Sequence, residues 1–465
     1  MAVNDTNTQY DYYSDLWKRC RDANEGQIAI HNAGKKYLAR LSGQTDDEFK
    51  AYIERTPFYE ATGRTVQGLC GTVFRKTPVI ESGGMEAYLE NVTSTGINLT
   101  SLSENATKQV LIVGRVGYLV DYPQAVGVQT RAEQEAMNIR PFVREYKAES
   151  IINWRTDIIN NMEVLTQVRL SEVVVEYDDT DYTEKEIERV RVLALENNVY
   201  SQRIYEKQKG RDKTEWVMID EIIPTIRGAS LSYIPFVFMS QYDNEPDVKN
   251  PPLSGLVNMN ISHYKTVADL EHGAHYTALP TAYVTGVQSE DGEAQVYRIG
   301  SGTAWSFVDP STKVGFLEFT GQGLGSLKEL KDDKEQLMAS LGAQMLTPSL
   351  RRNESTETAQ MRHMGENSVL ASLTKAVERG INEILRIMAE WLNVTPATIA
   401  LNTDFTPAKI DPAMMRELLM ALQAGRISQE TYFEQLKQGE IIADNIDYDD
   451  EISRIQTGLI VDVEV

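Results

Sequence analysis

The chain is poor in cysteine and has no long apolar run. Its 465 residues include only Cys20 and Cys70, which excludes a disulfide framework and a cysteine-rich zinc site and suggests a reducing compartment. The best apolar stretch, Leu231 to Gln241, is far shorter than the roughly 20 residues of a membrane span and contains Pro235. The first residues, Met1 to Asp11, are polar and acidic, unlike a signal peptide. We therefore expect no membrane segment and no secretory leader.

Basic charge is also in deficit. Lys and Arg number 46 against 68 Asp and Glu, a formal net charge of −22. Tight binding to nucleic acid by phosphate neutralisation needs clustered Lys and Arg, so this balance argues against a grip on DNA. It still allows a surface past which DNA slides, because repulsion prevents adhesion. The hydrophobic content of 42% and charged content of 25% are ordinary for a globular protein, here of about three domains or one elaborate one.

Signatures of common enzyme classes are missing. We find no Gly-x-Ser-x-Gly, His-Glu-x-x-His, Walker or EF-hand sequence. Gly321-Gln322-Gly323-Leu324-Gly325 lies between a predicted strand and a predicted helix, where phosphate loops occur. However, Ser326 stands at the sixth position and no βαβ pattern surrounds it. A flexible hinge is the favoured interpretation, with phosphate binding as the alternative.

Three other clusters have a structural and a functional interpretation. His272 and His275 follow Glu271 at a spacing that could place two ligands on one metal, but without a third ligand they favour helix packing, as does His263. The acidic run near Asp447 to Glu451 lacks the spacing of a calcium loop and suggests a solvated tail. The last two predicted helices could form a helix-turn-helix, but acidic residues outnumber basic ones there, which favours a packed helical hairpin.

The first half of the chain predicts helices followed by strands. Helical patterns cover Tyr10 to Leu41 and, after Pro57, extend to about Cys70. Capping boxes at Thr45-Asp46-Asp47-Glu48 and Ser101-Leu102-Ser103-Glu104 start two more helices, the second ending at Gly114. Residues 139–240 change to period two, which predicts an antiparallel meander with one wet face. The predicted fold class is therefore α+β.

The second half predicts two helices that flank a β insert. An Asn-, Asp- and Pro-rich linker, Asp243 to Pro252, precedes a helix that begins at Pro251-Pro252. The insert, Pro280 to Thr320, contains short strands at 281–285, 295–299, 303–308 and 315–319. A second helix covers about Leu324 to Leu341, and a helix of roughly 35 residues ends near Asn393, with Gly365 and Gly380 as bend points. Two short helices follow, Pro412 to Ala424 and Ser428 to Lys437.

One loop between these helices combines apolar side chains with a basic pair. It could be an ordinary connector, or it could contact something that moves past it. Its residues are Gln344, Met345, Leu346, Thr347, Pro348, Ser349, Leu350, Arg351, Arg352, Asn353 and Glu354.

In its order of segments the chain resembles a tailed-bacteriophage portal protein, the head-to-tail connector, of a subfamily long filed as a domain of unknown function. The likeness spans nearly the whole chain, although no single motif is as specific as a Walker sequence. The stretches that carry it are residues 37–45, 64–69, 73–78, 252–256, 357–360, 401–405 and 425–431.

The resemblance implies a layout of named parts. Residues 1–250 would form the wing, 251–278 and 322–342 the two stem helices, and 279–321 the β-containing clip between them. Residues 343–356 would be the tunnel loop facing DNA, 357–405 the long kinked helix of the wing, and 406–465 the helical crown.

The resemblance also implies a function and partners. Such a protein would be no enzyme and would need no cofactor. It would form a homo-oligomer, a dodecamer, at one capsid vertex of the virion, after synthesis in the host cytoplasm. Double-stranded DNA would pass through its channel without sequence specificity during packaging and ejection. The terminase large subunit, a head-tail adaptor, the major capsid protein and a scaffold would be partners. The alternatives are another virion connector or minor capsid protein, and a phosphate-ligand-binding enzyme.

Overall fold

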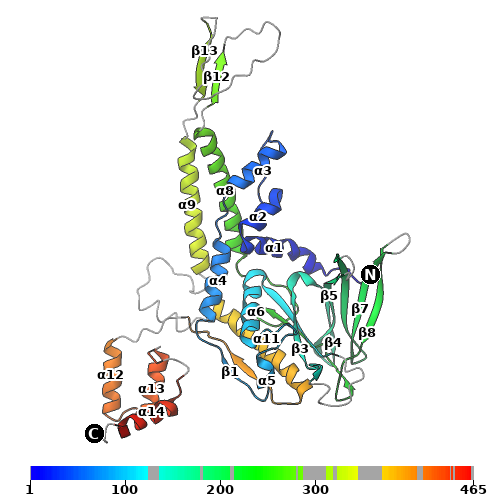
Figure 1. The fold of residues 1–465 in the computed structure, drawn as a ribbon, viewed down its shortest axis with the longest axis vertical. Helices are drawn as coiled ribbons and strands as arrows, with labels where there is room; N and C mark the ends of the chain where they lie inside the picture. Colours follow the sequence, from blue (N-terminus) through cyan, green and yellow to red (C-terminus); the bar gives the residue numbers. More distant parts are fainter. Residues whose placement is uncertain are drawn as a thin grey trace. The chain divides into compact units, whose positions relative to one another are not determined.

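The computed structural model describes most of the chain, and its fold is α+β as predicted. The described residues are 2–123, 136–177, 182–209, 214–278, 281–285, 311–317, 322–343, 369–405, 412–439, 441–442 and 446–461. The chain divides into two compact units: Met1–Cys70 with Ile80–Ile399, and Gly71–Val79 with Ala400–Val465. Figure 1 shows the elements of each.

Helices dominate the first hundred residues. They are α1 (Thr8–Glu25), α2 (Gln27–Ala33), the 3-10 turn η1 (Gly34–Lys36), α3 (Asp46–Arg55), α4 (Ala61–Val73), α5 (Glu86–Leu89) and α6 (Leu99–Val113). The capping box at Thr45 and Glu48 is confirmed. Two predicted starts are wrong. The helix expected at Pro57 begins at Ala61, and α6 is capped by Asn98, whose side chain accepts from Ser101 N at 2.8 Å.

A buried three-stranded antiparallel sheet forms the centre of the first unit. Its strand order is β11 (Phe236–Ser240), β2 (Arg115–Asp121), β3 (Phe142–Lys147). Helices α6 and α11 (Val369–Leu392) pack on it, and α11 buries apolar residues at helical spacing. The predicted long helix is therefore confirmed over Val369–Leu392, whereas its earlier part lies outside the described residues.

A five-stranded antiparallel sheet adds to this core. It consists of β4 (Ile151–Ile159), β5 (Met162–Tyr177), β6 (Glu184–Glu196), β7 (Val199–Lys209) and β8 (Thr214–Ile222), in sequence order. The predicted meander is confirmed, but the prediction that one face of the sheet is exposed to solvent along its whole length is not. Residues 190–195 of β6 are buried in succession, because both faces are covered there, whereas the far half of β5 is largely exposed.

Asparagine pairs make the tight turns of this sheet. Asn160 and Asn161 join β4 to β5, and Asn197 and Asn198 join β6 to β7, all four with positive φ. Two left-handed residues suit a two-residue hairpin, and asparagine tolerates this conformation better than other side-chain-bearing residues. Two further turns are expected from the sequence clusters Asp178-Asp179-Thr180-Asp181 and Lys209-Gly210-Arg211-Asp212, and these residues lie largely outside the described part of the chain.

The remaining small elements complete the first unit. They are the 3-10 turn η2 (Ala148–Ser150) and two short strand pairs, β9 (Thr225–Ile226) with β10 (Ala229–Ser230) and β1 (Val79–Glu81) with β14 (Thr398–Ala400).

Both cysteines are buried free thiols, and burial raises the pKa of Cys20 to about 12 and that of Cys70 to about 11.

The described C-terminal residues of the second unit form the helices α12 (Pro412–Gln423), α13 (Gln429–Gln438) and α14 (Tyr448–Val461). The first two and the turn at Gly425, which has φ of 64°, confirm the prediction. The expected acidic tail is wrong, because the acidic run starts a helix. The Asp447 carboxylate accepts from Asp449 N at 2.9 Å, and carboxylates favour the positive end of the helix dipole.

Candidate functional site: a helical pair and its β tip

Two long helices lie side by side and are joined by a β insert (Figure 1). They are α8 (Ser254–Ala278) and α9 (Gln322–Ala343), and we call them the helical pair. Helices α1 and α3 also pack on α8, which is why its apolar residues are buried on more than one side. These residues include Leu256, Val257, Ile261, Tyr264 and Val267. The helices expected from sequence are confirmed, with α8 beginning at Ser254 rather than Pro251.

Polar contacts fix the register of the helical pair. Lys334 Nζ donates to Ser262 O at 3.1 Å and to Thr266 Oγ1 at 2.7 Å. His263 Nε2 lies 3.2 Å from Glu335 Oε1, which also accepts from Lys331 Nζ at 2.9 Å. Burial lowers the pKa of His263 and outweighs the opposing effect of Glu335. Because such groups are costly to bury without partners, their pairing specifies one alignment of the two helices.

One glycine of the helical pair allows close packing, and two others stand in the sequence that suggested a phosphate loop. A Cβ at Gly273 of α8 would lie 2.8 Å from Leu324 Cδ2 of α9. Gly323 and Gly325 lie in the first turn of α9, and the preceding strand is paired antiparallel. A dinucleotide turn needs a parallel βαβ unit, so the arrangement does not support the phosphate alternative. The hinge expected there is not tested, because Gly321 lies outside the described residues.

Buried side chains fasten α8 to the helices before it. Asn260 is fully buried, and its Oδ1 accepts from Thr62 N at 3.2 Å and from Thr62 Oγ1 at 2.9 Å. Its Nδ2 donates to Tyr59 O at 2.7 Å. Tyr264 packs edge-on against Phe58. These contacts join α8 to the first turn of α4 and to the residues just before it.

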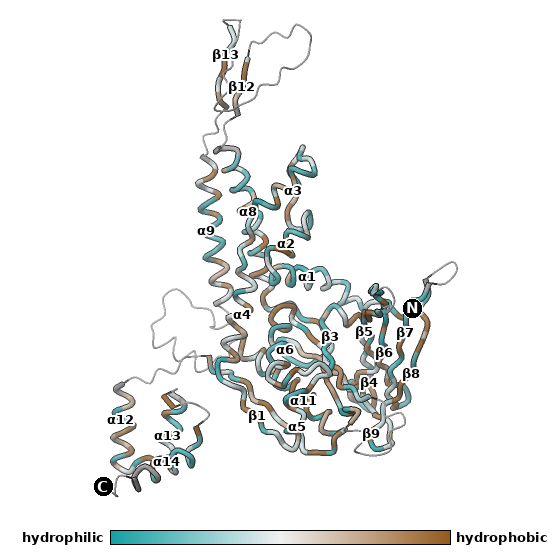
Figure 2. The backbone as a smooth tube through the Cα atoms, viewed as in Figure 1, coloured by the Kyte–Doolittle hydropathy of each residue, from teal (hydrophilic) through white to brown (hydrophobic). Residues whose placement is uncertain are grey.

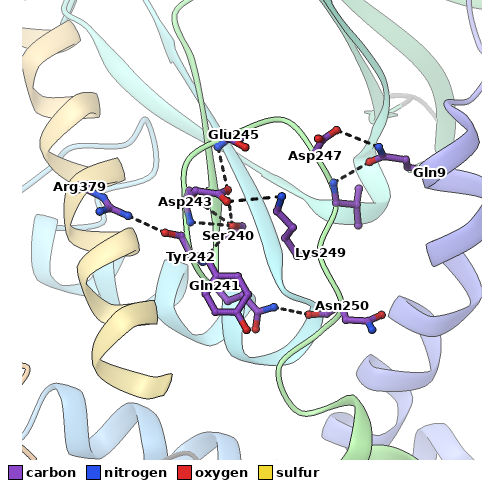
Figure 3. Close-up of polar contacts among 11 residues, drawn as sticks. Gln9, Ser240, Gln241, Tyr242, Asp243, Glu245, Asp247, Lys249, Asn250 and Arg379 are labelled. Atoms are coloured by element: carbon purple, nitrogen blue, oxygen red, sulfur yellow. Dashed lines mark hydrogen bonds and ion pairs between the residues drawn. The ribbon is translucent and has the colours of Figure 1, made fainter. Parts of the chain in front are cut away.

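The predicted linker is a fixed connection between the central sheet and α8 (Figure 3). Gln241 Nε2 donates to Asn250 O at 2.9 Å, and Ser240 Oγ donates to Asp243 O at 3.0 Å. Gln9 of α1 accepts from Val248 N at 2.9 Å, and Arg379 of α11 donates to Tyr242 O at 2.8 Å. The linker is thereby held from two sides by helices distant in sequence.

The β insert is described at its two ends, β12 (Thr281–Thr285) and β13 (Lys313–Leu317), which pair antiparallel. We call this pair the β tip. Tyr283 lies opposite Gly315, and a Cβ there would lie within 3 Å of the tyrosine ring. Tyr283, Val314 and Phe316 are exposed large side chains. A two-stranded sheet is marginal in water, so this apolar surface favours a partner. The strands expected at 295–299 and 303–308 lie outside the described residues.

The outer face of α9 is also apolar in part. Leu330 and Leu337, seven residues apart, are 45% and 50% exposed. Residues at this spacing lie on one helix face, so they form a stripe that α8 leaves exposed. Met338 is buried instead.

A family model described as a domain of unknown function (DUF4055) matches residues 252–392, the segment from α8 to the end of α11. This agrees with the expected likeness to a family filed under such a description. No curated protein matches the chain.

Solved structures of phage-like particles are similar at low identity. A chain of the neck of an empty gene transfer agent (GTA) particle, computed with C6 symmetry, has 11% identity and a TM-score of 0.37, covering 84% of this chain and 92% of that one. A chain of the native GTA virion has 11% identity and a TM-score of 0.38, covering 93% and 98%. A chain of the native GTA neck, computed with C12 symmetry, has 12% identity and a TM-score of 0.37, covering 88% and 98%.

Histidines of the helical pair pack against aromatic rings. His272 lies edge-on to Tyr52 at 5.2 Å, and His263 is tilted against Tyr59 at 5.5 Å. Among the residues that the structure describes, no three His, Cys, Asp or Glu side chains gather as metal ligands. The ring contacts agree with the helix-packing interpretation of His263 and His272. Within the same residues, no helix is long and apolar enough to cross a membrane.

The loop from Gln344 to Glu354 lies outside the described residues. The structure describes what surrounds it in sequence: α9 ends at Ala343 and α11 begins at Val369. The role predicted for this loop therefore stays a prediction.

Sequence reasoning missed Asn260 and Arg379 as positioning residues. Asn260 had a usable signal, because a polar residue on the apolar face of a predicted helix needs buried partners. Arg379 had no such signal in the sequence, since an exposed arginine near the middle of a helix is ordinary.

Proposed function

We propose that this chain is the subunit of a portal ring at one capsid vertex, a structural and non-enzymatic conduit for double-stranded DNA. The order of its parts supports this: a packed α+β body, a helical pair that carries a β tip, and a small helical unit. The helical pair would line the channel as the stem, and the β tip would be the clip. The loop from Gln344 to Glu354 would be the tunnel loop.

The uncovered apolar surface of the helical pair and β tip carries this proposal. Leu330 and Leu337 on α9, with Val314 and Phe316 on the β tip, lie open in the single chain. A neighbouring copy related by rotation would cover them in a head-to-tail contact, and such contacts close into rings when the rotation closes. A ring of this kind has a central channel.

The charge of the chain supports a conduit rather than a binder. A net charge of −22 per copy repels the DNA backbone, so DNA inside an acidic channel would move without adhering. Contact with DNA would then be independent of base sequence. Docking of a terminase large subunit and later of an adaptor is proposed for the β tip. The outer surface of the ring would meet the major capsid protein, and a scaffold would guide assembly.

Negative-stain electron microscopy of the purified protein tests the proposal, with class averages viewed along the ring axis. We expect rings of about twelve copies with a central hole. Compact particles without a channel at high concentration, together with no ring in capsid-like particles, would overturn it. A ring of another symmetry away from the tail vertex would favour another virion connector.

A variant of the α9 stripe sharpens this test. Leu330→Gln with Leu337→Gln should leave the fold intact and reduce ring formation, because it removes apolar area that the neighbour would cover. Tyr12→Gln is the matched control, since Tyr12 is 78% exposed on α1, outside the helical pair. Equal loss of rings in both variants would show that the α9 stripe is not the contact.

A further inference from the structure

Helix α12 of the second unit is apolar on most of its surface and yet is not covered. Residues 414–423 are all exposed or half-buried. Met414, Leu419 and Met420 are 51%, 42% and 59% exposed. Figure 2 colours the helix largely as hydrophobic. A helix that is apolar on most sides is stable only when it is buried, so α12 requires a partner beyond α13.

The outer face of α12 combines apolar and basic side chains. Arg416 precedes Leu419 and Met420 by three and four residues, so the three share one face. Met415, Leu418 and Leu422 are half-buried on the other side, where α13 packs. Arg416, and Arg426 in the turn after α12, are exposed. Their guanidinium groups have no hydrogen bond or ion pair to any described residue.

Helix α14 offers the complementary charge. Phe433 of α13 is buried and lies edge-on to Tyr448 at 5.5 Å, which fixes the start of α14 against α13. Asp449 and Asp450 follow on the exposed side of α14, and their carboxylates make no ion pair within the described residues. The same unit exposes Ile441 and Ile455, at 47% and 50%. The unit therefore has one face that is apolar and basic, while the first turn of α14 exposes a pair of carboxylates, which we call the α14 face; Ile455 lies on another side of that helix.

We propose that the outer face of α12 in one copy packs against the α14 face of the next copy, with Arg416 and Arg426 facing Asp449 and Asp450. The occupant is a second copy of this chain. Two unlike faces make the contact head-to-tail, and a twofold contact of α12 on α12 would instead bring the arginines together. This inference rests on the proposed ring and names a second set of contacts that closes it.

Charge reversal in the full-length chain tests the contact. One variant carries Arg416→Glu and Arg426→Glu, and the other carries Asp449→Lys and Asp450→Lys. In each variant alone, like charges would meet at every contact, so we expect the ring fraction to fall by at least about tenfold at low salt. In an equimolar mixture, each copy meets a neighbour of opposite charge when the two variants alternate. The mixture should therefore recover rings close to the wild-type amount, as counted by mass photometry and electron microscopy.

Controls separate this contact from folding and from the proposed function. Asp47→Lys reverses an exposed carboxylate in the first turn of α3, and Arg155→Glu reverses an exposed arginine on β4. Both should assemble like wild type. Wild-type assembly by both paired variants would overturn the contact, and so would a mixture that stays dispersed while each variant keeps wild-type helical circular dichroism. Either result would leave α12 packed on its own chain or unpartnered. A wild-type chain that forms no ring would overturn the proposed function instead.

Discussion

Single buried polar residues set the alignment of the helices. Asn260 uses three hydrogen bonds to join α8 to Thr62 in the first turn of α4 and to Tyr59 just before it, and His263 and Lys334 join α8 to α9. Apolar contacts alone tolerate sliding, because they are not directional, whereas a buried polar group without its partner is costly. The alignment of α8 with its neighbouring helices therefore depends on a few polar atoms.

Replacing Asn260 tests this dependence. Asn260→Ala removes the side-chain partner of the buried Thr62 N and Oγ1, whereas Tyr59 O keeps its bond from Ala61 N. We expect a loss of about 2–4 kcal/mol of unfolding free energy, measured as a lower Tm or urea midpoint. Asn258→Ala is the matched control on the same helix, because Asn258 is exposed and, among the described residues, its side chain accepts a hydrogen bond from Arg19 alone; its change should stay within about 0.5 kcal/mol. An equal effect of the two variants would contradict this role.

His263 makes the stability of the helical pair depend on pH. Its pKa is lowered from the ordinary value of 6.5, chiefly by burial, while Glu335 opposes and Lys331 and Lys334 add to the lowering. As pH falls below that value, the unfolded chain takes up the proton first, so the free energy of unfolding decreases. Wild type should lose more Tm than His263→Gln between about pH 7.5 and about pH 5.5. Parallel curves for the two proteins would show that His263 does not contribute.

Elements differ in how clearly their sequence specifies them. The amphipathic helices α8, α9 and α11 and the antiparallel meander could be predicted, because long runs with period 3.6 or 2 leave little ambiguity. Helix starts were less certain. The cap at Asn98 competes with Ser101 three residues later, and both are good N-cap residues. Helix α14 was missed because its acidic first turn resembles a solvated tail.

Part of the candidate site could not be predicted, because some of its residues are held by side chains that lie far away in the sequence. The helical pair followed from spacing, and the β tip followed from short β-rich runs. The rigid linker could not be predicted, because Gln9 and Arg379 reach it from far along the chain. The boundary between β6 and β7 was open to prediction, since the Asn197-Asn198 pair is a turn signal within the period-two segment 139–240.

Gly380 shows how closely α11 approaches the sheet. A Cβ at this position would lie 2.6 Å from Met239 Cγ and 2.8 Å from Asn244 Nδ2. Asn244 is held by bonds to Phe238 O and Ala376 O, so it cannot move freely. We expect Gly380→Ala to lower the free energy of unfolding by about 1–3 kcal/mol.

The matched control is Gly68→Ala in α4, where nothing lies within 4 Å of the added atom. That variant should gain up to about 1 kcal/mol from helix propensity. Chemical denaturation of both variants measures the contrast. A stabilising effect of alanine at position 380 would show that the core relaxes more easily than the distances suggest.

At the scale of the whole molecule, the two units leave different surfaces uncovered. The first unit exposes the α9 stripe and the β tip, and the second exposes α12. Monomeric proteins rarely leave such apolar area open, so both units favour an assembled state. Copies of a strongly acidic chain repel one another, and salt screens this repulsion. Ring formation should therefore increase with salt concentration wherever the screened repulsion between copies is larger than the screened attraction of local ion pairs.

Deleting Met345 to Arg352 tests the proposed channel loop in the assembled particle. We expect rings to form as in wild type but DNA packaging or retention to fall, because the loop would face DNA rather than a neighbouring copy. Arg351→Ala with Arg352→Ala separates the basic pair from the loop as a whole. Particle counts and encapsidated DNA measure the two steps. Failure of the deleted chain to assemble would show that the loop is structural.

The hydrogen bonds that hold α8 in place have a mechanical consequence. Asn260, the linker contacts of Gln9 and Arg379, and the bonds of Lys334 are spread along or next to one helix. A pull along that helix loads these bonds together, as a shear, instead of breaking them one after another. In single-molecule stretching from the β tip, α8 should therefore yield at high force in one step. A force applied along α8 would therefore reach the central sheet through several bonds at the same time.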